Sequence, residues 1–276
     1  MATSNIHPLL YDMADGVVAF STTREGGVGE GNYASFNINC FCGDKAEAVA
    51  ANRGILADYL GIDAGSIVMP HQTHGVETRI IADEFMHLPD NVRTMLLDGV
   101  DAVMTNLAGV CIGVSTADCI PVLLYDADHH AVCAVHAGWR GTLARIAHKA
   151  VLEMGMAFGS DPKHIKAIIG PGISRKNFEV GDEVYDAFEQ AAFDMAAVAT
   201  QEIKRNPDAS DPSKAFEKKW HIDLPLCNRQ QLEHVGIPSE NIHDAGVCTF
   251  DNADTFFSAR RLGTDSGRIF TGIMLR

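Results

Sequence analysis

The sequence predicts an α/β fold: a single domain covering residues 1–276, in which a mixed sheet is layered between helices in an α-β-α arrangement. Two observations predict this class. Short apolar runs rich in valine and isoleucine are mixed along the chain with segments of helical periodicity. Between residues 100 and 136, several apolar runs follow one another with short gaps, which indicates hairpins and favours a mixed sheet over a purely parallel one.

The elements can be assigned in chain order. An apolar run at 16–22 is followed by helical periodicity at 46–59 and by a short apolar run at 66–69. The central runs are continuously apolar, as expected of strands buried on both faces; they are 102–105, 110–115, 121–125 and 131–135. The remaining strands are expected at 165–169 and 268–274, and the remaining helices at 143–154, 182–192 and 226–232.

No segment looks separable from the rest of the chain, which favours one domain. The most loop-like stretch is 206–213, where two prolines stand among small polar residues, and we interpret it as an excursion between two helices. The seven cysteines form an odd set without a secretion signal, which does not suggest a disulfide framework.

The balance of charged residues limits the classes of partner that the protein is expected to bind. Lysine and arginine total 22 against 36 acidic residues, so the formal net charge is −14 and broad contact with nucleic acid or an anionic membrane is disfavoured. No apolar run approaches the ~20 residues that cross a bilayer, and the N-terminus does not resemble a signal peptide. We therefore expect a cytoplasmic protein.

Reactive side chains occur where three apolar runs end. His71 follows Pro70 at the end of the first run, the pair Asp118-Cys119 stands in a small-residue turn, and His136 precedes a glycine-containing turn. Residues at strand ends are held by a rigid sheet and face a crevice, which is where open α/β folds place function.

These residues allow two chemistries. His71, Cys119 and His136 form a plausible zinc set, because imidazole and thiolate suit zinc and three protein ligands leave a position open. Alternatively, Cys119 and His136 act as nucleophile and base, with Asp118 or another polar group orienting the imidazole. Their spacing in the sequence does not separate the two interpretations.

Arginines beside strand or helix ends are candidates for holding an anion such as phosphate. They are Arg24, Arg140 and Arg260, and a guanidinium can grip phosphate through paired hydrogen bonds. Surface salt bridges are the alternative explanation for each of them. Neither a Gly-x-Gly-x-x-Gly dinucleotide fingerprint nor a Gly-x-x-x-x-Gly-Lys-Ser/Thr loop occurs.

Taken together, these motifs resemble the YfiH family, whose members are also described as laccase-domain or multicopper polyphenol oxidase proteins. The matching pieces extend from about residue 16 to 275; they are the Ser-Thr-Thr-Arg-x-Gly-Gly of 21–27, Phe36-Asn37, the His-Gln-Thr-His-Gly of 71–75, the Thr-Ala-Asp-Cys-Ile-Pro of 116–121, the His-Ala-Gly-Trp-Arg-Gly of 136–141, the Gly-Pro-Gly-Ile of 170–173, Cys248-Thr249 and the Phe-Ser-x-Arg-Arg of 257–261.

The resemblance implies a layered α/β domain comparable to cysteine hydrolases, with zinc held by His71, Cys119 and His136. It implies that the partners are a purine nucleoside and phosphate, converted to the base and ribose 1-phosphate. Adenosine deamination and phosphorolysis of 5′-methylthioadenosine are implied as related activities. Asn37 or Asp118 would then hydrogen-bond the ribose or the base, and one of the three arginines would hold phosphate.

Two other activities are associated with the same family. The laccase description implies copper, but a multicopper oxidase uses paired His-x-His motifs and none of the 12 histidines forms one. Some bacterial members are linked to removing miscoupled residues from peptidoglycan precursors, which would make the protein a cysteine- or zinc-dependent amide hydrolase. The sequence indicates neither the preferred nucleoside nor the oligomeric state.

Overall fold

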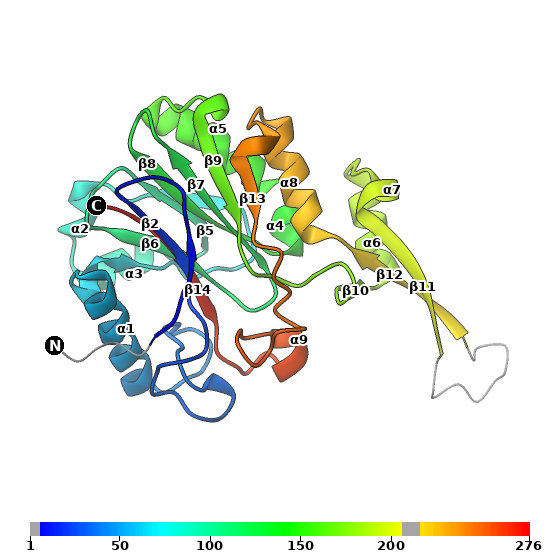
Figure 1. Cartoon of the computed structure of the whole chain (residues 1–276), viewed down its shortest axis with the longest axis horizontal. Coiled ribbons are helices and arrows are strands. Elements are labelled where there is room, and N and C mark those ends of the chain that lie inside the picture. The colour runs from blue at the N-terminus through cyan, green and yellow to red at the C-terminus, as the bar shows by residue number, and fades with distance from the viewer. Residues whose placement is uncertain (1–5, 206–215) are drawn as a thin grey trace.

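The computed structural model describes residues 6–205 and 216–276, which are built around two central sheets (Figure 1). A six-stranded sheet has the order β13 (Ile242–Asp244), β9 (Ile165–Ile169), β7 (Ile120–Asp126), β8 (Ala131–Ala137), β5 (Val100–Thr105) and β4 (Glu77–Ile80). A five-stranded sheet has the order β1 (Leu9–Tyr11), β2 (Val17–Ser21), β14 (Ile269–Leu275), β6 (Cys111–Thr116) and β3 (Ile67–Val68).

Both sheets are mixed, as the sequence predicts. In the larger sheet β7 is antiparallel to β8 and β9, whereas β4 runs parallel to β5 and β13 parallel to β9. The predicted hairpin of β7 and β8 is therefore confirmed. Strand β6 differs from that expectation, because it pairs with β14 and β3 in the other sheet. The short turn from β6 to β7 thus crosses from one sheet to the other.

The two sheets pack face to face, and helices cover their outer faces. Between the sheets lies a core that includes Ile112 and Val114 of β6 and Val132 and Ala134 of β8. Strand residues alternate between faces, so the neighbouring β8 residues Cys133 and Val135 belong to the core on the opposite side. Because both faces of β8 are covered by apolar side chains, its sequence is continuously apolar.

The helical layers complete the architecture. Helices α5 (Ile146–Phe158) and α8 (Leu224–His234) share a core with the outer face of the six-stranded sheet. Helix α1 (Ala46–Leu60) packs Leu56 and Leu60 against Phe20 and Phe270 on the outer face of the five-stranded sheet. The predicted α/β class with helices outside is confirmed. The β layer, however, contains two sheets, which an apolar run cannot distinguish from one sheet covered by helices.

A smaller three-stranded antiparallel sheet projects to one side of this body (Figure 1). It contains β10 (Glu179–Val180), β12 (Phe216–Ile222) and β11 (Ala199–Arg205), and it lies beside α6 (Asp182–Gln190) and α7 (Met195–Val198). The loop-like stretch 206–213 lies outside the described residues. The helices predicted at 182–192 and 226–232 correspond to α6 and α8, and the strands β11 and β12, which the sequence did not indicate, lie between them.

The remaining helices are short; they are α2 (Asp83–Met86), α3 (Asp90–Leu96), α4 (Trp139–Leu143) and α9 (Ala259–Leu262). The predicted helix at 143–154 corresponds to α5, which is separated from α4 by Arg145 in a left-handed conformation with φ of 61°. In the part of the chain described by the structure, no helix has the length and hydropathy needed to cross a membrane.

Candidate metal centre

Three potential metal ligands meet where the two sheets adjoin. They are His74 from the loop after β3, Cys119 from the turn between β6 and β7, and His136 near the end of β8. One donor atom from each lies within 4.8 Å of the other two. The Cys119 Sγ atom is 3.8 Å from His74 Nε2, and the two imidazole rings meet edge to face with centroids 4.8 Å apart. We call these three residues the His-Cys-His cluster.

Asp101, a fully buried carboxylate on β5, holds both histidines of the cluster in place. His136 Nδ1 lies 2.7 Å from Asp101 Oδ1, and the same carboxylate accepts hydrogen bonds from the backbone amides of Thr73, His74 and Gly75 at 3.3, 3.0 and 2.7 Å. A carboxylate bound to one imidazole nitrogen fixes the ring so that the other nitrogen, Nε2, faces the cluster.

Gln72 fastens the same loop to β6. Its side-chain amide donates to the Ser115 carbonyl at 2.8 Å, and its side-chain oxygen accepts from the Ser115 amide at 2.8 Å. The two bonds reproduce the pairing that a neighbouring strand would offer to this residue. His74 itself adopts a left-handed backbone conformation with φ of 64°, a conformation that non-glycine residues rarely adopt. The loop is therefore held in a specific shape that turns His74 toward Cys119.

The electrostatics couple Cys119 to His136. Burial alone would raise the pKa of the Cys119 thiol, but the two neighbouring imidazoles outweigh it and lower that pKa to about 6. Burial alone would lower the pKa of His136, but the Cys119 thiolate and the Asp101 carboxylate raise it to about 9. The charged thiolate is thus favoured at neutral pH. A thiolate is the form of cysteine that binds metal and the form that attacks carbon.

The donor set fits a metal ion. Two imidazoles and one thiolate come within one coordination sphere of each other, and Asp101 supplies the carboxylate contact that metal-binding histidines commonly make. His136 is 3% exposed, whereas His74 is exposed, so the cluster is buried on the β8 side and open on the His74 side. Three protein ligands at an open position are the arrangement of catalytic metal sites.

Gly138 leaves the space that the cluster occupies. A Cβ atom at this position would lie 2.8 Å from His74 Cδ2 and 3.1 Å from Cys119 Sγ. Because its φ of −65° suits any residue, a substitution acts through this contact and not through backbone strain. We expect Gly138→Ala to push His74 and Cys119 apart and weaken metal binding by about tenfold or more while the protein still folds.

Titration of the bound metal with a chelator measures that change, and a melting curve checks the fold. Gly54→Ala is a suitable control for a glycine substitution, since Gly54 lies within α1 without a positive φ and a Cβ there would meet nothing within 4 Å. Unchanged metal affinity in Gly138→Ala would show that the cluster tolerates a methyl group at its edge.

The structure places His71 away from the cluster. Its Nδ1 lies 2.7 Å from Asp98 Oδ1, and its ring stacks on Phe41 with centroids 4.3 Å apart. His71 also pairs with Asp98 through a backbone bridge. We therefore replace His71 by His74 in the candidate ligand set. The chain turns between the two histidines, so that His74, and not His71, reaches Cys119.

Asp118 does not orient the imidazole of His136. Its carboxylate accepts a hydrogen bond from Thr249 Oγ1 at 2.6 Å and another from the Arg260 backbone amide at 2.7 Å. With φ of 90°, Asp118 shapes the turn that carries Cys119 and ties it to the C-terminal part of the chain. The orienting role suggested for Asp118 belongs to Asp101.

Asn37 and Arg24 are engaged within the fold. Asn37 is fully buried; its amide donates to Asp44 Oδ2 at 2.9 Å, and its oxygen accepts from the Arg268 amide at 3.1 Å. Arg24 donates to the carbonyls of Ala34 and Ala253 at 2.9 and 2.6 Å and lies over Phe257. The hydrogen bonds of both side chains thus join loops of the fold to one another.

The other two candidate arginines differ from each other. Arg260 donates to the Glu179 carbonyl at 3.2 Å from two guanidinium nitrogens, so it links α9 to β10. Arg140 is exposed, and its guanidinium carbon lies 4.2 Å from the ring centroid of Trp139. Trp139 directly follows Gly138, which borders the cluster. Arg24 and Arg260 donate to backbone carbonyls, whereas the described structure shows no such bond for the Arg140 guanidinium. Arg140 is also close in sequence to His136 of the cluster.

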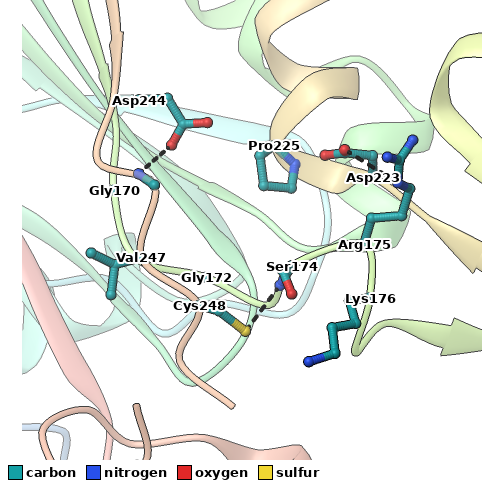
Figure 2. A pocket seen from close by; sticks show the side chains of 11 residues that line it. Gly170, Gly172, Ser174, Arg175, Lys176, Asp223, Pro225, Asp244, Val247 and Cys248 are labelled. Carbon is teal, nitrogen blue, oxygen red and sulfur yellow. Dashed lines mark hydrogen bonds and ion pairs between the residues drawn. The ribbon is translucent and has the colours of Figure 1, made fainter. Parts of the chain in front are cut away.

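A cavity of about 320 Å³ is lined by residues that include Gly172 and Cys248 (Figure 2). Gly172 also lies against the turn that carries Cys119, since a Cβ at Gly172 would lie 3.3 Å from the Cys119 carbonyl oxygen. Its walls carry Arg175, Lys176 and Cys248, and Cys248 Sγ accepts hydrogen bonds from the Ser174 amide at 3.4 Å and the Asn177 side chain at 3.3 Å. Although burial raises the pKa of Cys248, these bonds lower it below its ordinary value.

The sequence reasoning missed Asp101 and did not assign His74 to the metal. A signal for Asp101 was present, since it is a charged residue inside a continuously apolar strand, where an unpaired carboxylate would be costly. His74 stands in the same His-Gln-Thr-His motif as His71, and only the path of the loop distinguishes them.

Comparisons with known proteins show a matching family and similar enzymes. A family model described as "Multi-copper polyphenol oxidoreductase laccase" matches residues 18–276. The chain is similar to a purine nucleoside phosphorylase of Bacteroides thetaiotaomicron, with 44% identity covering 93% of this chain and 90% of that protein. It is also similar to "Adenosine deaminase RL5" of an unknown prokaryotic organism, with 43% identity covering 94% of each.

The fold has a counterpart among solved structures. The crystal structure of the hypothetical protein YfiH of Bacillus licheniformis aligns with a TM-score of 0.85 and 28% identity, covering 100% of this chain and 98% of that one. The likeness thus extends along the whole chain.

Proposed function

Because the chain belongs to the family described as multi-copper polyphenol oxidoreductase laccase, the YfiH family indicated by its motifs, we propose that it is a zinc-dependent purine nucleoside phosphorylase. Membership confirms the resemblance drawn from the sequence, and the names of its relatives confirm that the chain is an enzyme. The proposal rests on one combined observation: the His-Cys-His cluster occurs in a chain 44% identical to a purine nucleoside phosphorylase.

Zinc is the metal that we assign to the cluster. His74, Cys119 and His136 would hold it, since zinc accepts imidazole and thiolate ligands and needs no redox partner. When bound, zinc supplies Lewis-acid polarisation at its open position. We expect about one equivalent of zinc per chain by elemental analysis. One equivalent of copper, or several, would favour the oxidase chemistry of the family description instead.

The reaction transfers the ribose from the purine to phosphate. An oxygen of phosphate forms a bond to C1′ of the ribose while the bond from C1′ to the purine nitrogen breaks, which yields ribose 1-phosphate and the base. The chain's part is to bring the two substrates together beside the cluster and to stabilise their charges. Asp101 keeps His136 and the His74 loop in position during these steps.

Arg140 is our candidate for holding phosphate. It is the second residue of α4, two positions after Gly138, and its guanidinium can offer paired hydrogen bonds to phosphate oxygens. We expect Arg140→Ala to raise the KM for phosphate by about tenfold or more, because one charged contact is lost. Adenosine deamination, which needs no phosphate, should keep most of its rate.

Arg140→Lys and Arg24→Ala are informative partners for that measurement. Lysine keeps the positive charge but not the paired hydrogen bonds of a guanidinium, so Arg140→Lys should bind phosphate better than Arg140→Ala and less well than the unchanged protein. Arg24 is tied to backbone carbonyls, so its loss should lower the melting temperature and spare the ratio of the two reactions. Equal losses of phosphorolysis and deamination in Arg140→Ala would contradict a phosphate role.

The proposed function itself is tested by separating products. Purified protein loaded with zinc is incubated with inosine or adenosine, with and without phosphate, and the products are resolved by chromatography. Phosphate-dependent release of the base together with ribose 1-phosphate is expected. 5′-Methylthioadenosine should also react, because bond exchange at C1′ leaves the 5′ group untouched. Release of the base at the same rate with and without phosphate would contradict phosphorolysis.

Adenosine deamination is a second activity that we assign to the same site. The relative named adenosine deaminase covers 94% of this chain at 43% identity, as closely related as the phosphorylase. Deamination replaces the 6-amino group by oxygen from water and releases ammonia, so inosine should accumulate from adenosine when phosphate is withheld.

Amide hydrolysis by a cysteine nucleophile is the competing proposal. Cys119 contacts His136, and His136 is oriented by Asp101, which is the order of groups in a cysteine-histidine-acid arrangement. Such an enzyme could edit peptidoglycan precursors and would need no metal. Removal of the metal separates this proposal from the zinc one.

A further inference from the structure

A second cavity, of about 440 Å³, lies in a part of the molecule that the proposed reaction does not use. It is enclosed by the 40–41 turn, helix α1, the 64–69 segment and helices α2 and α3. Most of its wall is apolar, formed by Ile67, Val68, Met69, Phe41, Phe85 and Leu97. None of the His-Cys-His cluster lines it. Its volume falls within the range of pockets that take small molecules.

Two arginines line the same cavity, together with Asp90 and Thr94. Arg53 of α1 is partly buried and donates to the carbonyl of Ile67 at 2.8 Å. No carboxylate in the described structure lies within salt-bridge distance of its guanidinium. A guanidinium withdrawn from water without an opposite charge is costly, because carbonyl dipoles replace only part of its hydration. Burial accordingly lowers the pKa of Arg53.

Arg93 of α3 adds a second positive charge on the same wall. Its side chain is 20% exposed, and it pairs with Asp90, whose own side chain is 90% exposed. The pocket therefore carries two guanidinium groups against one carboxylate that faces the solvent. A local excess of positive charge is unusual in a chain with a formal charge of −14. It singles out this cavity as a place where an anion is favoured.

We propose that this cavity binds a small organic anion, with its acidic group on Arg53 and Arg93 and an apolar body against Phe41, Phe85 and Met69. The guanidinium fork suits a carboxylate or a phosphate ester, and the apolar wall favours an anion with a hydrophobic part over one without. An anion at Arg53 would supply the opposite charge that the fold itself does not provide. This site is independent of the proposed phosphorolysis.

Cys40 makes binding measurable without any assay of activity. It is exposed and lines the cavity, so an occupant should shield its thiol from alkylation. The full chain loaded with zinc is alkylated with iodoacetamide, with or without benzoate as the probe, and modification of each cysteine is followed by peptide mass spectrometry. Benzoate should slow the labelling of Cys40 in a saturable manner. Labelling of Cys248, in the other cavity, should not change.

Two further probes examine the charge and the apolar body separately. Benzyl alcohol has a similar shape without the charge, and inorganic phosphate has the charge without the apolar part. Protection by benzoate that exceeds protection by either of them is expected. Equal protection by benzyl alcohol would overturn the role of the arginines, and equal protection by phosphate would overturn the apolar part of the proposal.

Substitutions locate the anion. Arg53→Met and Arg93→Met should each weaken benzoate binding by about tenfold or more, because each removes a charged contact. Arg79→Met is the matched control, since Arg79 also donates to a backbone carbonyl, that of Leu96 at 3.1 Å, but does not line the cavity. If Arg53→Met unfolds, Arg93→Met still decides. Absence of benzoate binding, or unchanged binding in the arginine variants, would overturn the proposal.

Discussion

Replacing His74 by alanine is expected to abolish retention of the metal and both nucleoside reactions, whereas replacing His71 should change neither by much. His74 supplies one of the three donor atoms that lie within 4.8 Å of one another. Groups that only orient a ligand are already worth about 10–100-fold in metal affinity, so loss of a ligand should exceed that range. Chelator competition with zinc, followed by the nucleoside assay, measures both effects.

His71→Ala is the matched control for this substitution, because it removes the other histidine of the same motif. His71 is stacked on Phe41 and bonded to exposed Asp98, so its loss should lower stability slightly and leave zinc bound. If His71→Ala lost the metal and His74→Ala kept it, the loop would have a different path from the one described here.

Asp101→Asn is expected to weaken zinc binding and activity by about 10–100-fold while the protein remains folded. Asparagine keeps the size and one acceptor oxygen, so some bonds to the backbone amides of the His74 loop survive. It removes the negative charge that fixes the His136 imidazole and makes its Nε2 a better ligand. The loss should appear in metal affinity and kcat more than in the KM for the nucleoside.

Asp98→Asn provides the comparison for Asp101→Asn. Asp98 also contacts a histidine at 2.7 Å, but its side chain is 69% exposed and its histidine lies outside the cluster. An exposed pair of this kind contributes little. Melting curves for both variants separate a positioning role from general destabilisation. Equal zinc affinity in Asp101→Asn and in the unchanged protein would remove Asp101 from the site.

The sequence predicted the fold well where hydrophobic patterning alone decides it. The runs at 121–125 and 131–135 became β7 and β8, and the periodicity at 46–59 became α1, because burial dictates both patterns. It did not reveal that β6 and β7 belong to different sheets. An apolar strand is equally apolar whether a helix or a second sheet covers it. The pairing between β6 and β14, whose partners lie 153 to 163 residues apart in the chain, therefore has no local signal in the sequence.

The site was predicted in part for a related reason. Cys119 stands in the short turn between β6 and β7, His136 stands near the end of β8, and the structure brings the two together. His74 reaches them only because Gln72 and Asp101 bend the loop after β3, through contacts 43 and 27 residues apart in the chain. Long-range hydrogen bonds of this kind have no periodicity in the sequence. Asn37, Arg24 and Arg260 were chosen by residue type, and their partners could be known only from the fold.

Removal of the metal is the most direct test of the zinc assignment. Protein stripped by a chelator, and shown by elemental analysis to be free of metal, should lose phosphorolysis and deamination and regain both on addition of one equivalent of zinc. If Cys119 were the nucleophile, stripping would leave its thiolate free to attack, and substrate-derived mass would accumulate on that residue. Full activity in metal-free protein, together with such an adduct on Cys119, would contradict the account.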